Sequence, residues 1–190
     1  MEMPIVRSSI VSACMAIGLL LGGRVPAAAQ QPTEEAAVIG GAVRHVVQQL
    51  RGGGELPQGI VRFDPRVVVD RVVQNPAYPD GRAVGYDLAG ARPPEHAAAA
   101  RRAMSAEPGT VDGARVCATE SLRSCTLRDA VAIFAAGRPV LRGDYAEVVV
   151  KGLWLTPSTR QPVHDGVFSV TLVRTAEGWR PVATRTLSIS

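Results

Sequence analysis

The chain is poor in histidine and cysteine, which bind many metal ions, and in aromatic residues, which stack on bases in many nucleic-acid sites. Its 190 residues include three histidines, three cysteines and only 4% aromatic residues. The histidines stand apart, without the HxH, HxxxH or HExxH spacing of metal ligands, so the sequence predicts no metal site and no cofactor. The longest basic run is Arg101–Arg102, and no aromatic residues alternate with it to stack on bases. No nucleic-acid partner is therefore predicted.

Motifs of nucleophilic hydrolysis and of phosphate binding are missing as well. The sequence contains no Gly-x-Ser-x-Gly elbow and no Ser-x-x-Lys. The glycine-rich stretch at 52–59 lacks the Gly-Lys-Ser/Thr that ends a phosphate-binding loop. Nucleophilic hydrolysis and phosphate binding by such a loop therefore lack their usual sequence signs.

The first 29 residues have the pattern of a secretory signal peptide. Arg7 supplies a positive charge, residues 8–23 carry none, and the small residues Ala27–Ala29 predict cleavage before Gln30. We therefore expect a periplasmic or secreted protein. Its mature part, residues 30–190, has about 160 residues, the length of a single domain.

Two alternatives to cleavage concern the same segment. An uncleaved helix would anchor the protein in the membrane, facing the periplasm, and only then is membrane contact expected. The uncharged run of 8–23 would span about 24 Å, which is short of the roughly 30 Å hydrocarbon core. Val11–Cys14 resembles a lipoprotein signal, but Cys14 follows Arg7 too closely to leave room for an apolar region before it.

Cleavage leaves two cysteines, Cys117 and Cys125. An even pair in an exported chain predicts a disulfide. The intervening residues are enough for a tight turn that brings the two sulfur atoms within bonding reach. Because the spacing is not CxxC, the pair does not indicate a redox motif or a zinc knuckle.

Two helices are expected in the first half of the mature chain. From Thr33, apolar residues recur every four positions, and Gly52–Gly54 ends the pattern. The stripe consists of Val38, Ile39, Ala42, Val43, Val46, Val47 and Leu50. A second helix is expected from Pro93 to about Ala106, with Glu95 in its first turn. Residues 30–32 are expected to be a loose tail.

The region between these helices is harder to assign. Ile60–Phe63 predicts a short strand that Asp64–Pro65 closes, with Asp64 capping a turn. Residues 66–73 are apolar and β-branched, and both a strand and a short buried helix remain open. Residues 74–92, with several prolines and glycines, predict the main irregular loop of the chain.

The C-terminal half is expected to be mostly strand. After a strand within 127–136, residues 143–190 predict a three-stranded antiparallel meander with strands at 145–155, 163–175 and 179–190. The fold class is therefore α+β, with an N-terminal helix and a second helix packed on a curved antiparallel sheet.

Two segments of this half resemble a known family. The strand start Gly143–Val150 and the ending Glu177–Val182, with the turn at Thr156–Arg160 between them, are similar to the nuclear-transport-factor-2-like (cystatin-like) domains of exported bacterial proteins of unassigned activity. The resemblance covers about residues 111–190 and implies a cone-like fold. Members of that family include cyclases, isomerases, dehydratases and ligand-binding modules, so it does not imply one function.

Few residues are candidates for a site. His164 and Asp165 are the catalytic candidates, although neighbouring strand residues point to opposite faces. Trp154, Trp179 and Phe168 are candidates for lining a pocket, which would favour an apolar or aromatic ligand. The other polar residues considered, His45, Asp64, Glu95 and His96, are interpreted as structural.

These observations favour an exported, non-catalytic envelope module that binds a small apolar ligand or a protein partner. The alternatives are a small cyclase- or isomerase-type enzyme of the same fold, with His164 or Asp165 as general base, and a membrane-anchored accessory subunit.

Overall fold

The computed structural model describes residues 27–74, 77, 82–104, 127, 130–155 and 162–189. Several predictions concern other residues. The apolar run at 8–23, Cys14 and the predicted Cys117–Cys125 disulfide all lie outside the described residues. They stay predictions from the sequence.

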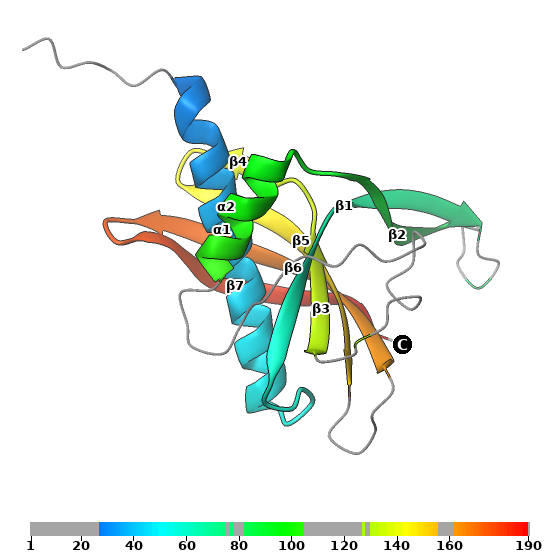
Figure 1. Ribbon diagram of the computed structural model, residues 1–190. Helices are drawn as coiled ribbons and strands as arrows, with labels where there is room; N and C mark the ends of the chain where they lie inside the picture. Colours follow the sequence, from blue (N-terminus) through cyan, green and yellow to red (C-terminus); the bar gives the residue numbers. More distant parts are fainter. Residues whose placement is uncertain are drawn as a thin grey trace, which may run out of the picture.

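The described residues fold into two helices and seven strands (Figure 1). In chain order they are α1 (Ala27–Gly52), β1 (Ile60–Gln74), β2 (Arg82–Ala91), α2 (Pro94–Met104), β3 (Ala130–Ala136), β4 (Val140–Arg142), β5 (Tyr145–Leu155), β6 (Pro162–Thr175) and β7 (Gly178–Ile189). The strands form one sheet in the order β2-β1-β3-β5-β6-β7, and β4 pairs with β5. Among the strands that the structure describes, β1 and β3 form the one parallel pair.

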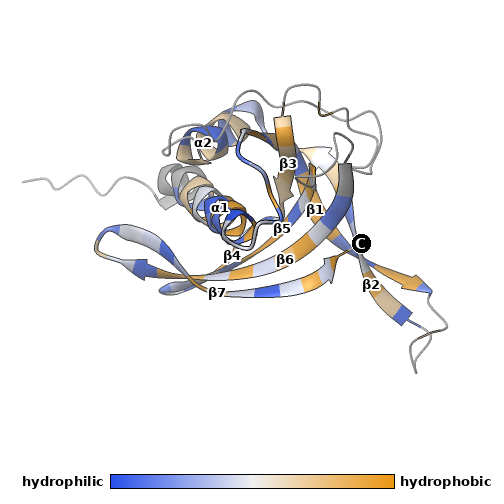
Figure 2. Cartoon of the chain, turned by 90° about the horizontal axis from the view of Figure 1, so that it is seen from below, coloured by the Kyte–Doolittle hydropathy of each residue, from blue (hydrophilic) through white to orange (hydrophobic). Residues whose placement is uncertain are grey.

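The sheet is curved and open, and both helices lie on its concave side (Figure 2). This is the α+β class that the sequence predicts. The meander is present as well, because β5 pairs antiparallel with β6 and β6 with β7. Its strands begin and end within one residue of the predicted bounds, apart from the last residue of the chain, which is not described.

The predicted stripe of α1 forms the centre of the core. All seven of its residues are at most 5% exposed, and they pack against the concave faces of β1, β3, β5 and β6. The start of the helix differs from the prediction, since α1 begins at Ala27 and residues 30–32 are helical. Alanine has the highest helix propensity of any residue type, which favours helix at Ala27–Ala29, so α1 begins before Thr33, where the apolar pattern predicts its start.

β1 corrects the prediction that Asp64–Pro65 ends a strand. The strand runs on to Gln74, pairing with β3 from Ile60 to Val67 and with β2 from Arg66 onward. Both ladders shift register at this point, and Pro65 has no partner in either. A proline, which lacks an N–H, is tolerated in a strand at such a bulge because no ladder hydrogen bond is lost.

β2 corrects the prediction of an irregular loop over 74–92. Its residues Arg82–Ala91 form a strand along the second half of β1, with Val72 opposite Val84. The Arg71 guanidinium and the Asp87 carboxylate pair across the two strands at 3.0 Å. Hydrogen bonds to β1 hold this glycine-containing segment extended. The sequence of residues 82–91 does not reveal this pairing, because the partner strand lies elsewhere in the chain.

Candidate functional site

The structure separates the two catalytic candidates. His164 stands opposite Trp154 in the β5–β6 ladder, with the ring centroids 6.0 Å apart, whereas Asp165 stands opposite Leu153. Trp154 belongs to the core beneath α1, and Leu153 to a smaller apolar cluster on the other face of the sheet. His164 and Asp165 therefore lie on opposite faces and do not share a pocket.

The aromatic candidates lie in or against the core. Trp154 is fully buried and Phe168 is 5% exposed, with a centroid separation of 6.2 Å. A Cβ at Gly166 would lie 2.7 Å from Cη2 of Trp154, so glycine leaves the room that this ring fills. Trp179 is half-buried, and the Arg174 guanidinium covers its ring at 4.8 Å. None of the three aromatic residues lines the cleft described next.

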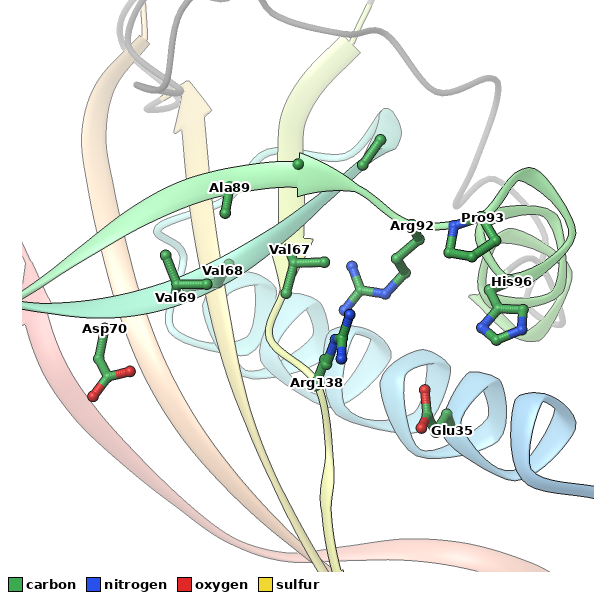
Figure 3. A pocket seen from close by; sticks show the side chains of 12 residues that line it. Glu35, Val67, Val68, Val69, Asp70, Ala89, Arg92, Pro93, His96 and Arg138 are labelled. Carbon is green, nitrogen blue, oxygen red and sulfur yellow. The ribbon is translucent and has the colours of Figure 1, made fainter. Parts of the chain in front are cut away.

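A cleft of about 680 Å³ opens where the β1–β2 hairpin meets the two helices (Figure 3). We call it the arginine cleft. Its lining comes from Glu35 of α1, residues 67–70 of β1, residues 89–93 at the end of β2, His96 of α2 and Arg138 in the β3–β4 connection. In Figure 3 the guanidinium groups of Arg92 and Arg138 lie next to each other, with Glu35 and His96 on the helix side and Val67 and Val69 on the hairpin side.

Arg92 is the structural centre of this cleft. It is 8% exposed, and its guanidinium donates to the carbonyl oxygens of Ala136 and Gly137, both at 2.7 Å, and of Arg66 at 3.2 Å. One side chain thereby joins the end of β2 to β1 and β3. Burial lowers the pKa of Arg92 to about 10. Among the charges, those of Glu35 and Asp64 raise this pKa, and that of Arg138 lowers it. Arg92 remains protonated at neutral pH.

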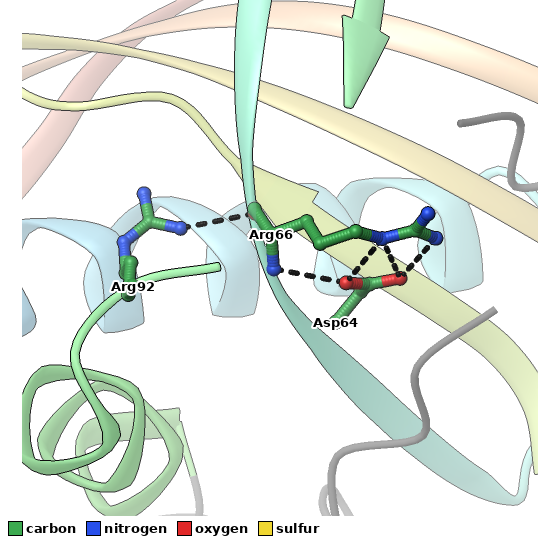
Figure 4. Close-up of polar contacts among 3 residues, drawn as sticks. All are labelled: Asp64, Arg66 and Arg92. Atoms are coloured by element: carbon green, nitrogen blue, oxygen red, sulfur yellow. Dashed lines mark hydrogen bonds and ion pairs between the residues drawn. The ribbon is translucent and has the colours of Figure 1, made fainter. Parts of the chain in front are cut away.

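Asp64 and Arg66 form a second polar unit beside Arg92 (Figure 4). The Asp64 carboxylate is fully buried and accepts hydrogen bonds from Nη2 of Arg66 at 2.8 Å and from its Nε at 3.1 and 3.2 Å. The backbone N–H of Arg66 also donates to Oδ1 of Asp64 at 2.9 Å, within the strand and not in the strand-ending turn that the sequence predicts. Arg66 binds both oxygens of the Asp64 carboxylate. These contacts link the residues on either side of Pro65 and so stabilise the bulge of β1.

The remaining charged groups of the cleft are less engaged. Arg138 is exposed, and within the described part of the chain no hydrogen bond or ion pair involves its guanidinium. Glu35 and His96 are half-buried and, among the described residues, no hydrogen bond joins them. The cleft therefore offers one fixed guanidinium, Arg92, and one that can turn toward a ligand, Arg138.

Arg92 and Arg138 are residues of the candidate site that the sequence does not reveal. Arg92 follows β2 directly and precedes two prolines, and Arg138 stands in a short connection between glycine and proline. Neither position matches a motif. His96, which the sequence indicates to be structural, lies near the start of α2 and also in the wall of the cleft. His45 is half-buried on α1, and burial lowers its pKa.

Metal binding and membrane insertion find no support among the described residues. The described residues include no group of three or more His, Cys, Asp or Glu side chains that could hold a metal ion. Neither of the described helices is long and apolar enough to cross a membrane.

Comparisons with protein-family models, with curated proteins and with solved structures find no match to this chain.

Proposed function

We propose that the chain is an exported binding module that holds a small molecule in the arginine cleft. The observation that carries this proposal is the cleft itself, whose volume of about 680 Å³ is within the range of ligand sites. Valines and alanine line one side of it, and a few polar groups converge on the other. This combination of an apolar wall with few polar groups is typical of small-molecule sites.

Binding is better supported than catalysis. The predicted base candidates His164 and Asp165 lie outside the arginine cleft and on opposite faces of the sheet. A catalytic base is commonly oriented by a hydrogen bond from a third group, and among the described residues none joins Glu35 to His96. The sequence is compatible with binding of either a small ligand or a protein partner. The cleft favours a small ligand, because its volume and lining are typical of small-molecule sites.

A neutral apolar dye tests the site. We expect the mature protein to bind N-phenyl-1-naphthylamine with a rise in fluorescence, and Ala89→Trp to weaken binding at least tenfold because the indole fills the cleft. Ala183→Trp is the matched control, since Ala183 is also an exposed alanine on an edge strand but lies on β7, away from the cleft. Equal dye binding by both variants, or no binding by the unaltered protein, would overturn the proposal.

Export is a separate part of the proposal, supported by the signal-peptide pattern of residues 1–29. N-terminal sequencing of the protein recovered from its native cells should begin at Gln30. A chain that retains residues 8–23 would instead support the membrane-anchored alternative.

A further inference from the structure

Two positive charges meet in the arginine cleft, and among the described residues no carboxylate bridges them. The guanidinium of Arg92 donates to backbone carbonyl oxygens, those of Arg66, Ala136 and Gly137. The nearby Asp64 carboxylate is bound by Arg66. Arg138 adds a second positive charge, which disfavours the charged form of Arg92. Two like charges that face one cleft are relieved by an anion placed between them.

The negative groups of the cleft do not bridge the two guanidinium groups. The charge of Glu35 raises the pKa of Arg92 and opposes the smaller effect of Arg138, but within the described residues Glu35 forms no ion pair with Arg92 or Arg138. Asp70 is exposed and lies on the hairpin side, away from the two guanidinium groups (Figure 3). Among the described residues, therefore, no carboxylate pairs with Arg138, and its guanidinium can bind a negative group from outside the protein.

An apolar surface adjoins the two arginines in the same cleft. Val67 is 9% exposed, Val69 is 37% exposed, and Ala89 stands opposite Val67 in the β1–β2 ladder. All three line the cleft. A ligand that reached both parts would need a charged end and an apolar body, because burying a charge against valine is costly.

We propose that the ligand of the arginine cleft is a small organic anion whose acidic group binds Arg138 beside Arg92 and whose apolar body covers Val67, Val69 and Ala89. This inference rests on the proposed function and adds the chemical class of the ligand. Arg138 is the residue that recognises the anion, since its planar fork of donors matches both carboxylate and phosphate. Arg92, held by three carbonyl oxygens, is a positioning residue.

Displacement of the neutral dye measures this preference. Decanoate and decyl phosphate share the anionic end and the apolar chain, and decanamide has the chain without the charge. We expect the better of the two anions to displace the dye at a concentration at least tenfold lower than decanamide. The ranking of decanoate against decyl phosphate identifies whether a carboxylate or a phosphate is preferred.

Variants connect the preference to Arg138. Arg138→Gln should reduce the anion advantage, measured for each variant as the displacement by the better anion relative to decanamide, to less than threefold, and Arg138→Lys should retain part of it. Arg142→Gln is the matched control, an exposed arginine on β4 outside the cleft, and should keep the full advantage. Glu35→Gln removes a competing carboxylate and should increase anion affinity severalfold.

The outcomes separate the two proposals. If the dye binds in the cleft but decanamide displaces it as well as both anions do, the ligand class is wrong and the binding function stands. The same conclusion follows if Arg138→Gln keeps the full advantage. If the dye does not bind the unaltered protein, the proposed function fails and this inference fails with it.

Discussion

The two halves of β1 have similar compositions and opposite surroundings. In the first half Val61 and Phe63 are at most 1% exposed, whereas in the second half Val72 is 64% exposed. The first half pairs with β3 beneath α1, and from residue 68 on the strand pairs only with β2 (Figure 1). Apolar, β-branched residues thus form a strand in both halves. The first half is buried because α1 packs over it.

The arginine cleft lies at the boundary between these halves. There the bulge at Asp64–Arg66 changes the partner of β1, and Arg92 joins the three strands that meet. The hairpin beyond this point carries the apolar wall of the cleft at Val69 and Ala89. Arg92, which joins the strands where β1 changes partner, therefore also lines the candidate site.

Core truncation in the first half of β1 should have the largest effect. We expect Phe63→Ala to lower the free energy of unfolding by about 3–5 kcal/mol, because it leaves a cavity under α1. Val72→Ala in the exposed half should change it by less than about 0.5 kcal/mol. Urea denaturation of the two variants measures both. Comparable losses would show that the second half of β1 is covered in solution.

Loss of the Arg92 fork should have the next largest effect. Arg92→Gln leaves buried carbonyl oxygens of β1 and β3 without donors, and we expect a loss of about 2–3 kcal/mol in unfolding free energy. Arg92→Lys keeps the charge but loses the planar set of donors of the guanidinium group. Its unfolding free energy should lie between those of Arg92→Gln and the unaltered protein. Arg138→Gln, at an exposed site, is the control and should stay within about 0.5 kcal/mol. An Arg92→Lys protein as stable as the original would contradict the role given to the fork.

The smallest effect is expected at the bulge itself. Asp64→Asn can still accept from the N–H of Arg66 but loses its charge, so we expect a loss of about 1–2 kcal/mol. A double-mutant cycle with Arg66→Gln should return a coupling energy of similar size. Additive single effects would show that the ion pair does not hold the two halves of β1 together.

Local patterns predicted much of the fold. The four-residue repeat in α1 identified residues that the structure buries, and the alternation in Tyr145–Leu155 predicted β5 with the bounds that the structure shows. Both signals are local, because a helix face or a strand face is encoded in residues a few positions apart.

The errors have a common cause. Residues 82–91 read as a loop because Gly85 and Gly90 interrupt any alternation, and only pairing with β1 makes them a strand. Pro65 read as a strand end because the change of partner from β3 to β2 is not visible from its neighbours. In each case a hydrogen-bonding partner distant in the sequence decided the structure.

The sequence by itself determined the amphipathic helix, the alternating strands of the meander and hence the α+β class, since each depends on the spacing of apolar residues within one segment. The tertiary structure alone decided where the candidate site lies. Arg92 and Arg138 come from segments about 45 residues apart, and they meet because β1 and β3 run parallel while β2 returns along β1. Without that pairing neither residue differs from any other arginine of the chain.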